Sequence, residues 1–386
     1  MVNLSSPLTE ERCHHVNTQR RRTWIGAAGA LLTAALLSTG AAGTSAAAPA
    51  PTAAPAASPI VSVPVSFTVQ NINRTTVACP SDGKTYTIKG HITGTAASLA
   101  KPTATTLYLH AVTQGEFYWN FNGAPNYNVA NQQAANGHVS VTIDRLGYGA
   151  SDKPPGLDSC MGSQADTAHQ VVQALRTGAY KVGSGAPAKF SKVFLAGHSA
   201  GGLIATIESY TFRDIDGLIN YAWSDTTTSA FLTTQLSKTE ARCLTNAAGV
   251  GGILAPIGLG SSGTPKNYEP FGDDVAGILF HSATPQVRAA VPAPNPDPCG
   301  DLLSIPAALV ADAVGVSTDT APVLILGGEN DALFPAPDMQ LQALRYIASP
   351  SVTVKVFPNT AHGLNYEASH LDQVALVSSW LTARGA

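Results

Sequence analysis

Short apolar runs, separated by polar and helix-like stretches, set out the organisation of the chain. Runs rich in β-branched and aromatic residues predict strands at 61–69, 85–93, 105–110, 139–143, 193–196, 217–223, 322–326 and 352–357. Apolar positions three to four residues apart predict helices at 166–177, 203–207, 339–347 and 371–383. This alternation indicates an α/β fold with a mostly parallel, eight-stranded sheet flanked by helices, and functional groups at the carboxyl ends of the strands.

Residues 226–320 break this pattern, because they are first rich in Thr, then in Gly and then in Pro. Roughly 95 residues are too many for a simple connection inside a compact domain. We therefore expect an inserted cap at 226–320 that divides a core of residues 60–225 and 321–386. Its glycines are not followed by the Gly-Lys-Ser/Thr ending of a phosphate-binding loop, which favours turns over a nucleotide site.

The N-terminus has the pattern of an export signal. Three arginines at 20–22 precede an apolar stretch at 24–37 that is too short to span a membrane, and small residues follow at 45–48. We expect a signal peptide over residues 1–47, with the paired arginines permitting twin-arginine export, and no membrane span in the mature chain. An uncleaved membrane anchor is the alternative. Residues 48–59 form a Pro/Ala linker that cannot bury a core.

Composition narrows the class of protein. The chain has 386 residues, of which 44% are hydrophobic and only 12% are charged, and its formal net charge is −3. This is a globular composition, and it lacks the basic surface that a nucleic-acid partner requires. Oligomeric state is left open by the sequence.

Four cysteines remain after removal of the signal, an even number that suggests two disulfides in an exported protein. Of the three possible pairings we favour Cys79–Cys160 with Cys243–Cys299, because it keeps each bridge within one half of the chain. Neither a Cys-x-x-Cys motif nor a Cys/His cluster is present, so we expect no metal site. We interpret His169, in the helix predicted at 166–177, as an ordinary, partly exposed histidine.

The most informative stretch is Gly197-His198-Ser199-Ala200-Gly201, which follows a predicted strand and precedes a predicted helix. Small glycines let the turn close, which lifts the serine clear of the backbone. The amide of Ala200 then lies at a helix N-terminus, where it suits a developing oxyanion. We interpret His198 as a neighbour of the nucleophile without a role as base.

A serine hydroxyl needs a base to remove its proton, and a carboxylate to orient that base. Asp331 and His362 supply these groups, because each follows a predicted strand directly. Ser199, Asp331 and His362 therefore come after strands five, seven and eight of the predicted sheet. The turn Asp144-Arg145-x-Gly147-x-Gly149-x-Ser151 follows another strand.

From about residue 61 to the C-terminus, these motifs together resemble the α/β-hydrolase fold of serine hydrolases. The resemblance rests on Gly197-x-Ser199-x-Gly201, the turn after Asp144, Gly328-Glu329-Asn330-Asp331 and Ala361-His362-Gly363. It implies that Ser199 is the nucleophile, His362 the base and Asp331 its orienting acid, with no metal or organic cofactor. A serine at the turn argues against dehalogenase and epoxide hydrolase chemistry, which use a carboxylate nucleophile in this superfamily.

Two features depart from the pattern of relatives. Many relatives have His-Gly after the third strand, where this chain has His110 and Ala111. We expect the amide of Val112 to be the second oxyanion donor, with Thr113 as the alternative, and His110 to stabilise the loop. Some relatives take the acid after strand six, so Asp225 competes with Asp331.

The expected function is that of a secreted serine hydrolase acting on small or polymeric esters of uncharged or apolar groups. The aromatic residues Tyr118, Trp119, Trp223 and Phe231 flank the expected pocket, where they either bind substrate or pack in the core. The same three catalytic groups would also serve an amidase, peptidase, lactonase or perhydrolase. A non-catalytic binding protein on the same fold is the alternative from another class.

Overall fold

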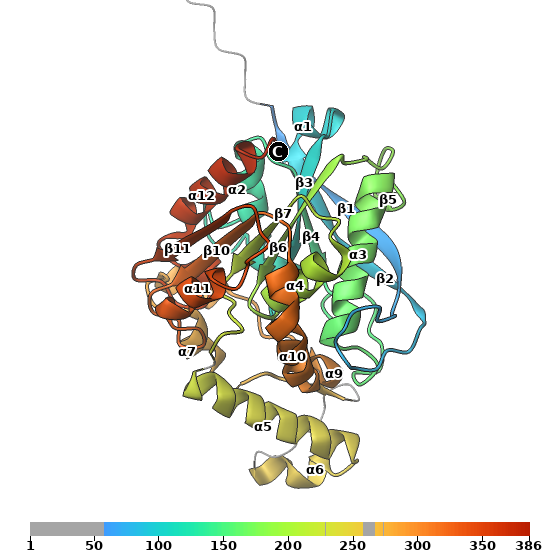
Figure 1. The fold of residues 1–386 in the computed structure, drawn as a ribbon, viewed down its shortest axis with the longest axis vertical. Coiled ribbons are helices and arrows are strands. Elements are labelled where there is room, and N and C mark those ends of the chain that lie inside the picture. The colour runs from blue at the N-terminus through green and yellow to red at the C-terminus, as the bar shows by residue number, and fades with distance from the viewer. Residues whose placement is uncertain (1–57, 228, 258–266, 273) are drawn as a thin grey trace, which may run out of the picture. The chain divides into compact units, whose positions relative to one another are not determined.

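The computed structural model describes residues 58–227, 229–257, 267–272 and 274–386 (Figure 1). The expected signal peptide at 1–47, and all but the last two residues of the linker at 48–59, lie outside the described residues. No helix in the described ranges combines the length and the apolar character needed to cross a membrane.

Nine strands of the described chain form one sheet, in the order β11-β10-β7-β6-β3-β4-β2-β1-β5. All eight expected strands are present, and the two-residue β5 extends the edge beyond β1. The strands are β1 (Ile60–Gln70), β2 (Thr85–Thr95), β3 (Ala104–Leu109), β4 (Ser140–Asp144), β5 (Lys181–Val182), β6 (Lys192–His198), β7 (Gly217–Tyr221), β10 (Val323–Gly328) and β11 (Val352–Phe357).

The sheet is parallel from β4 through β3, β6, β7 and β10 to β11, and antiparallel where β2 joins β4 and β1 joins β2. Parallel strands need crossover helices, and these cover both faces of the sheet. The helices of the first half are α1 (Ala96–Ala100), α2 (Val129–Ala135), α3 (Met161–Thr177) and α4 (Ala200–Phe212); those near the C-terminus are α11 (Ala336–Ala343) and α12 (His370–Thr382).

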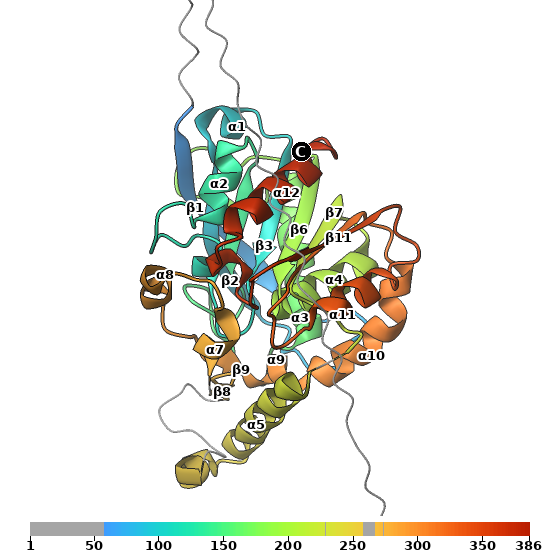
Figure 2. The same ribbon diagram turned by 90° about the vertical axis from the view of Figure 1, so that its left-hand side faces the viewer.

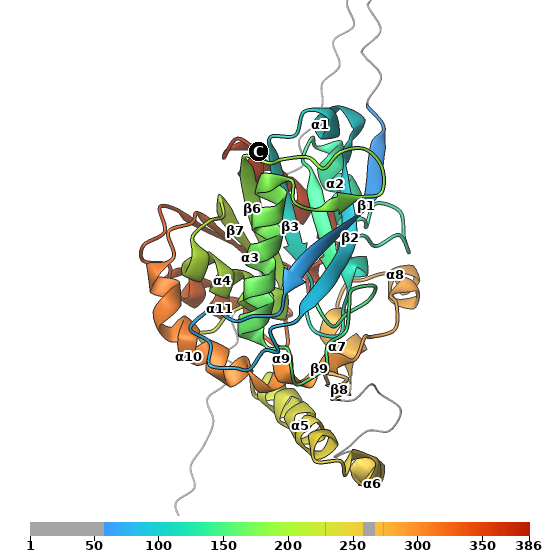
Figure 3. The same ribbon diagram turned by 90° about the vertical axis from the view of Figure 1, so that its right-hand side faces the viewer.

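Strand β6 shows why both faces are covered. Val193 and Leu195 belong to one apolar cluster, with α3 and α4, whereas Phe194 and Ala196 belong to a second cluster, with α2 and α12. Because side chains alternate along a strand, a strand that is buried on both faces has an unbroken apolar sequence. Figure 2 shows α12 in front of the sheet, and Figure 3 shows α3 in front of the opposite face.

The segment between β7 and β10 is largely helical. Helix α5 (Ala230–Ala247) and the short α6 (Gly251–Leu254) lie beyond the carboxyl ends of the parallel strands in all three views (Figures 1–3). The elements that follow are η2 (Ala255–Ile257), β8 (Tyr268–Glu269), α7 (Val275–Leu279), α8 (Pro285–Ala290), β9 (Asp297–Pro298), α9 (Cys299–Leu303), α10 (Ile305–Gly315) and η3 (Val316–Thr318). Helix α10 packs against α4, and α9 against α3.

Two disulfides cross-link the described chain, and both have the expected pairing. Cys79, in the turn-rich stretch between β1 and β2, is bonded to Cys160, the residue before α3. Cys243 on α5 is bonded to Cys299, the first residue of α9. The second disulfide therefore ties α5 to an element that packs on the core of the molecule.

Candidate active site

Ser199 lies at the sharp turn between β6 and α4. Its φ of 53° and ψ of −120° are unusual for a residue with a side chain. The turn closes because its neighbours are small: a Cβ at Gly197 would lie 2.1 Å from the carbonyl oxygen of Gly201, and a Cβ at Gly201 would lie 2.4 Å from that of Leu109. Such a strained position points to function.

His362 and Asp331 meet at the carboxyl end of the sheet, on the loops that follow β11 and β10. Nδ1 of His362 lies 2.8 Å from Oδ2 of Asp331, and both side chains are buried. The other oxygen of Asp331 accepts from the amides of Leu333 and Phe334, at 2.8 and 3.1 Å. Because an ionised carboxylate only accepts hydrogen bonds, this contact favours a proton on Nδ1 of His362 and directs Nε2 away from Asp331.

Asp225, the competing acid, is directed elsewhere. Its buried side chain forms an ion pair with Arg345, and burial raises the pKa of its carboxyl. The carboxylate that bonds His362 is therefore that of Asp331.

His198, which the sequence left without a role, holds His362 in place. Its Nε2 lies 2.8 Å from the carbonyl oxygen of His362 and donates to it, and its ring stacks on Tyr118 with centroids 4.3 Å apart. Burial, and then the nearby His362, keep the pKa of His198 well below its usual value, so the ring is neutral. No motif signals this contact, because it joins positions 164 residues apart.

The two expected oxyanion donors, the amides of Val112 and Ala200, have no acceptor within the described part of the chain. Val112 and Ser199 line the same cavities, and Ala200 opens α4. The alternative donor, Thr113, is excluded because its amide donates to Oδ1 of Asp297 at 2.6 Å. Because of that bond the Thr113 amide is not available to a substrate. The same bond stabilises the loop, in which Thr113 has a left-handed backbone with a φ of 62°.

Ser199 and His362 line one small cavity together with the loop at 111–114. A second cavity, of about 40 Å³, continues from Ser199 between apolar side chains of the core and of the segment between β7 and β10. Its walls include Val112, Leu203, Trp223, Leu232, Leu236, Phe271, Ile305, Leu309, Leu333 and Phe334.

The four aromatic candidates for the pocket separate in the structure. Trp223 lines the cavity and contacts Phe334, as expected. Tyr118 and Trp119 are completely buried in the core on the side of the sheet that carries α12, and Phe231 is 38% exposed on α5. None of these three is among the side chains that line the two cavities at Ser199.

Comparison with known proteins places this arrangement in a family. Residues 107–376, more than two thirds of the chain, match the sequence pattern described as the alpha/beta hydrolase family. The chain belongs to the α/β-hydrolase family. No curated protein matches it in sequence.

Solved structures of the α/β-hydrolase fold resemble the chain at low identity. A thermophilic esterase from Thermogutta terrifontis is 18% identical, over 83% of this chain and 100% of that one, with a TM-score of 0.54. A soluble variant of monoglyceride lipase from Saccharomyces cerevisiae is 15% identical, over 79% of this chain and 94% of that one, with a TM-score of 0.54. A haloalkane dehalogenase variant from Bradyrhizobium elkanii is 16% identical, over 83% of this chain and 97% of that one, with a TM-score of 0.53. At these identities the likeness establishes the fold, and the chemistry rests on the site.

In this α/β-hydrolase the loop after β3 is held by His110, in the structural role expected for it. Nδ1 of His110 lies 2.7 Å from the carbonyl oxygen of Ala111, and Nε2 accepts from the amide of Arg145 at 3.0 Å. The Arg145 side chain donates back to the His110 carbonyl at 2.9 Å and pairs with Asp301. These contacts connect the turn after β4 with the loop that carries Val112.

Proposed function

We propose that this α/β-hydrolase is a serine esterase for substrates with an uncharged, short acyl group. The observation that carries the proposal is the bond between Asp331 and Nδ1 of His362, in a site where His362 and Ser199 line the same cavity. A serine at a strained turn, a histidine with a free Nε2 and a buried carboxylate are the parts of a nucleophilic hydrolase.

The reaction would proceed through an acyl-enzyme. His362 takes the proton of Ser199 through Nε2 as the Ser199 oxygen attacks the substrate carbonyl carbon, and Asp331 stabilises the imidazolium. The amides of Val112 and Ala200 receive the negative oxygen. His362 then protonates the leaving alcohol, and the same histidine activates water to release the acid.

The small volume of the second cavity, which extends from Ser199, favours substrates with a small acyl group. Its volume of about 40 Å³ is far below the roughly 300–1,000 Å³ of sites for drug-sized ligands, and its walls are apolar. An apolar wall penalises a charged acyl group, because no polar partner replaces the lost water. We therefore expect acetate to butyrate esters to be preferred over long-chain esters.

We also propose that the protein is exported, with residues 1–47 acting as the signal. Two disulfides are typical of proteins that mature in an oxidising compartment. The sequence of the mature N-terminus, determined on protein from culture supernatant, tests this proposal. A start near residue 48 supports export with cleavage, and an intact N-terminus retained in membranes contradicts it.

Hydrolysis of p-nitrophenyl esters from acetate to palmitate, beside one p-nitroanilide, tests the proposed activity. We expect turnover to be greatest for the short esters, absent in Ser199→Ala, and unchanged in the control Ser317→Ala, whose hydroxyl bonds only the carbonyl of Val314 in the described chain. Equal turnover by Ser199→Ala, or none by a folded wild-type protein, would contradict the proposal. Faster cleavage of the anilide would assign the site to amides.

A further inference from the structure

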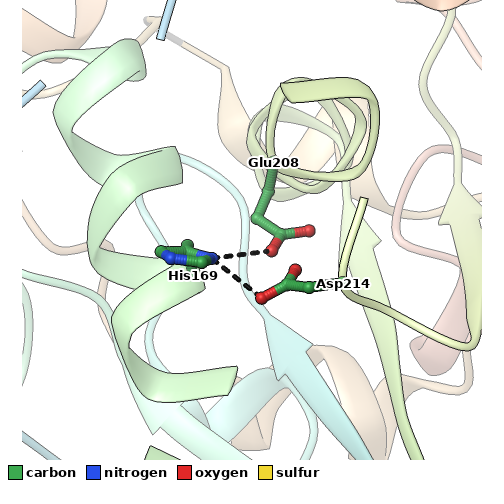
Figure 4. Close-up of side chains that lie close together, drawn as sticks. All are labelled: His169, Glu208 and Asp214. Atoms are coloured by element: carbon green, nitrogen blue, oxygen red, sulfur yellow. Dashed lines mark ion pairs between the residues drawn. The ribbon is translucent and has the colours of Figure 1, made fainter. Parts of the chain in front are cut away.

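A second cluster of titratable side chains, one histidine and two acids, lies toward the other end of α4. His169 from α3, Glu208 from α4 and Asp214 from the turn before β7 point toward one another (Figure 4). Nδ1 of His169 lies 2.9 Å from Oδ2 of Asp214 and 3.9 Å from Oε1 of Glu208. One nitrogen and two carboxylate oxygens thus lie within 4.8 Å of one another.

Glu208 is the unusual member of this group. Its side chain is completely buried and faces the carboxyl group of Asp214, and neither of its oxygens accepts a hydrogen bond from a recognised donor among the described residues. Oδ1 of Asp214 also lacks a donor, and Nδ1 of His169 lies beside the other oxygen of Asp214, at 2.9 Å. Buried polar groups are normally paired, so a completely buried Glu208 without a donor indicates a missing ligand.

The charges around the cluster favour a cation. Two acidic side chains, Glu208 and Asp214, lie beside one histidine nitrogen. Two arginines lie nearby, but Arg74 is paired with Asp166 and Arg176 with Asp216. Within the described chain neither guanidinium group forms an ion pair with Glu208, although Arg176 donates to the backbone carbonyl oxygen of Asp214.

We propose that His169, Glu208 and Asp214 form a binding site for a divalent transition-metal ion, with Zn²⁺ as the best match. One imidazole nitrogen and two carboxylate oxygens are a ligand set that zinc accepts at about 2.0–2.2 Å each. Such bonds separate neighbouring ligand atoms by roughly 3.3 Å, between the 2.9 Å and 3.9 Å that separate Nδ1 of His169 from the two acids. Water supplies the fourth ligand, since the side chains of His169 and Asp214 are 15% and 18% exposed.

Contacts around the cluster already orient the ligands. The ring of His169 stacks on Phe212 with centroids 3.9 Å apart, and the side-chain amide of Gln173, one turn along α3, donates to Oδ2 of Asp214. Such surrounding contacts are typical of metal ligands. No sequence motif signals the site, because its three residues are spread over two helices and a turn.

The ion would have a structural role. Glu208 is nine residues beyond Ser199 on the same helix, which places it about 14 Å along the axis from the nucleophile. A metal bridging α3 to the end of α4 therefore fastens the helix that begins at Ser199, without contact with the substrate. We expect stability to depend on the ion and chemistry at Ser199 to proceed without it.

Titration of chelator-treated protein with ZnCl₂, followed by calorimetry and thermal unfolding, tests the site. We expect one Zn²⁺ per chain and a rise in the unfolding temperature, because an ion that binds the folded state stabilises it. His169→Asn and Glu208→Gln should each weaken binding at least tenfold. The control His91→Asn, which removes another histidine–carboxylate pair, with Glu116 at 2.8 Å, should bind as the wild type does.

Cobalt provides an independent signature, because Co²⁺ bound to nitrogen and oxygen ligands in a four-coordinate site absorbs visible light strongly. That absorption should appear with wild-type protein and be lost in His169→Asn. If Glu208→Gln does not fold, His169→Asn alone decides, since this histidine is partly exposed. No stoichiometric binding by wild-type protein, or binding by both ligand variants that is as tight as that of the wild type, would overturn the proposal and favour a protonated Glu208 facing Asp214.

Discussion

Asp331 and Asp225 are both buried acids that follow strands, and their partners separate their roles. Asp331 bonds His362, whereas Asp225 pairs with Arg345. Asp331→Asn should lower kcat by about 10⁴-fold with little loss of stability, because the amide no longer fixes the histidine tautomer. Asp225→Asn should leave kcat within about threefold and reduce the free energy of unfolding by roughly 1–3 kcal/mol, because a buried ion pair is broken.

Ester kinetics and chemical unfolding of both variants check this division. A large loss of kcat in Asp225→Asn, with Asp331→Asn nearly as active as the wild type, would reverse the assignment of the acid.

Asp297 should make stability depend on pH. Burial raises the pKa of its carboxyl to about 7 from its usual value near 3.8. A carboxyl with a raised pKa in the folded state favours folding while it is protonated. That contribution is complete below about pH 4 and is lost as the pH rises to about 7, at up to about 1.4 kcal/mol for each pH unit.

Unfolding in denaturant at pH values from 4.5 to 7.5 measures this effect. The free energy of unfolding of Asp297→Asn should fall less steeply with pH than that of the wild type, whereas Asp372→Asn, at an exposed position, should follow the wild type. Parallel curves for wild type and Asp297→Asn would contradict the raised pKa.

Individual residues show where sequence reasoning succeeds and where it stops. The elbow serine, the acid after β10 and the histidine after β11 could be named because each directly follows a strand. From the sequence, Asp225 could not be excluded as the acid, nor Thr113 as an oxyanion donor. Their partners in the structure, Arg345 and Asp297, are distant in sequence. Long-range contacts of this kind leave no local pattern.

At the scale of elements, the segment between β7 and β10 supports the candidate oxyanion loop. The amide of Asn295 donates to the carbonyl of Thr113 at 2.7 Å, and its side chain donates to that of Gln114 at 2.9 Å. Asp297 adds its bond to the Thr113 amide. The Cys243–Cys299 disulfide lies two residues beyond, so it helps to hold Val112 beside Ser199.

Removal of this disulfide should therefore affect both stability and catalysis. The double variant Cys243→Ser/Cys299→Ser should lose about 4 kcal/mol in the chain-entropy estimate for a loop of 56 residues, and its kcat should fall. Cys79→Ser/Cys160→Ser, which opens a loop of 81 residues and whose two cysteines both lie outside this segment, should lose similar stability with kcat unchanged. Equal kcat in the two double variants, each assayed while folded, would contradict the link to the loop.

The strands could be predicted almost to their ends, whereas the helices of 226–320 could not. Helix α5 turns Leu232, Gln235, Thr239, Arg242 and Cys243 inward, so its buried face is largely polar and lacks apolar periodicity. Helix α10 is apolar on exposed positions as well, with Val310 74% and Val314 71% exposed. Helix α10 therefore lacks the contrast of faces on which sequence-based prediction depends.

At the scale of the whole molecule, α4 connects the candidate active site to the proposed metal site. Its first residue follows Ser199, and Glu208 lies near its other end. The family fold explains the first site, because parallel strands bring their carboxyl ends to one edge of the sheet. The second site depends on α3 packing beside α4, which is a property of the assembled chain.

The proposed function depends on Ser199 being an activated nucleophile. Labelling with a fluorophosphonate, followed by peptide mass spectrometry, tests this most directly. We expect one label per chain, on the peptide that contains Ser199. Ser199→Ala should not be labelled, and labelling of His362→Ala should be much slower. A folded wild-type protein that stays unlabelled, or a label on another residue that persists in Ser199→Ala, would contradict it.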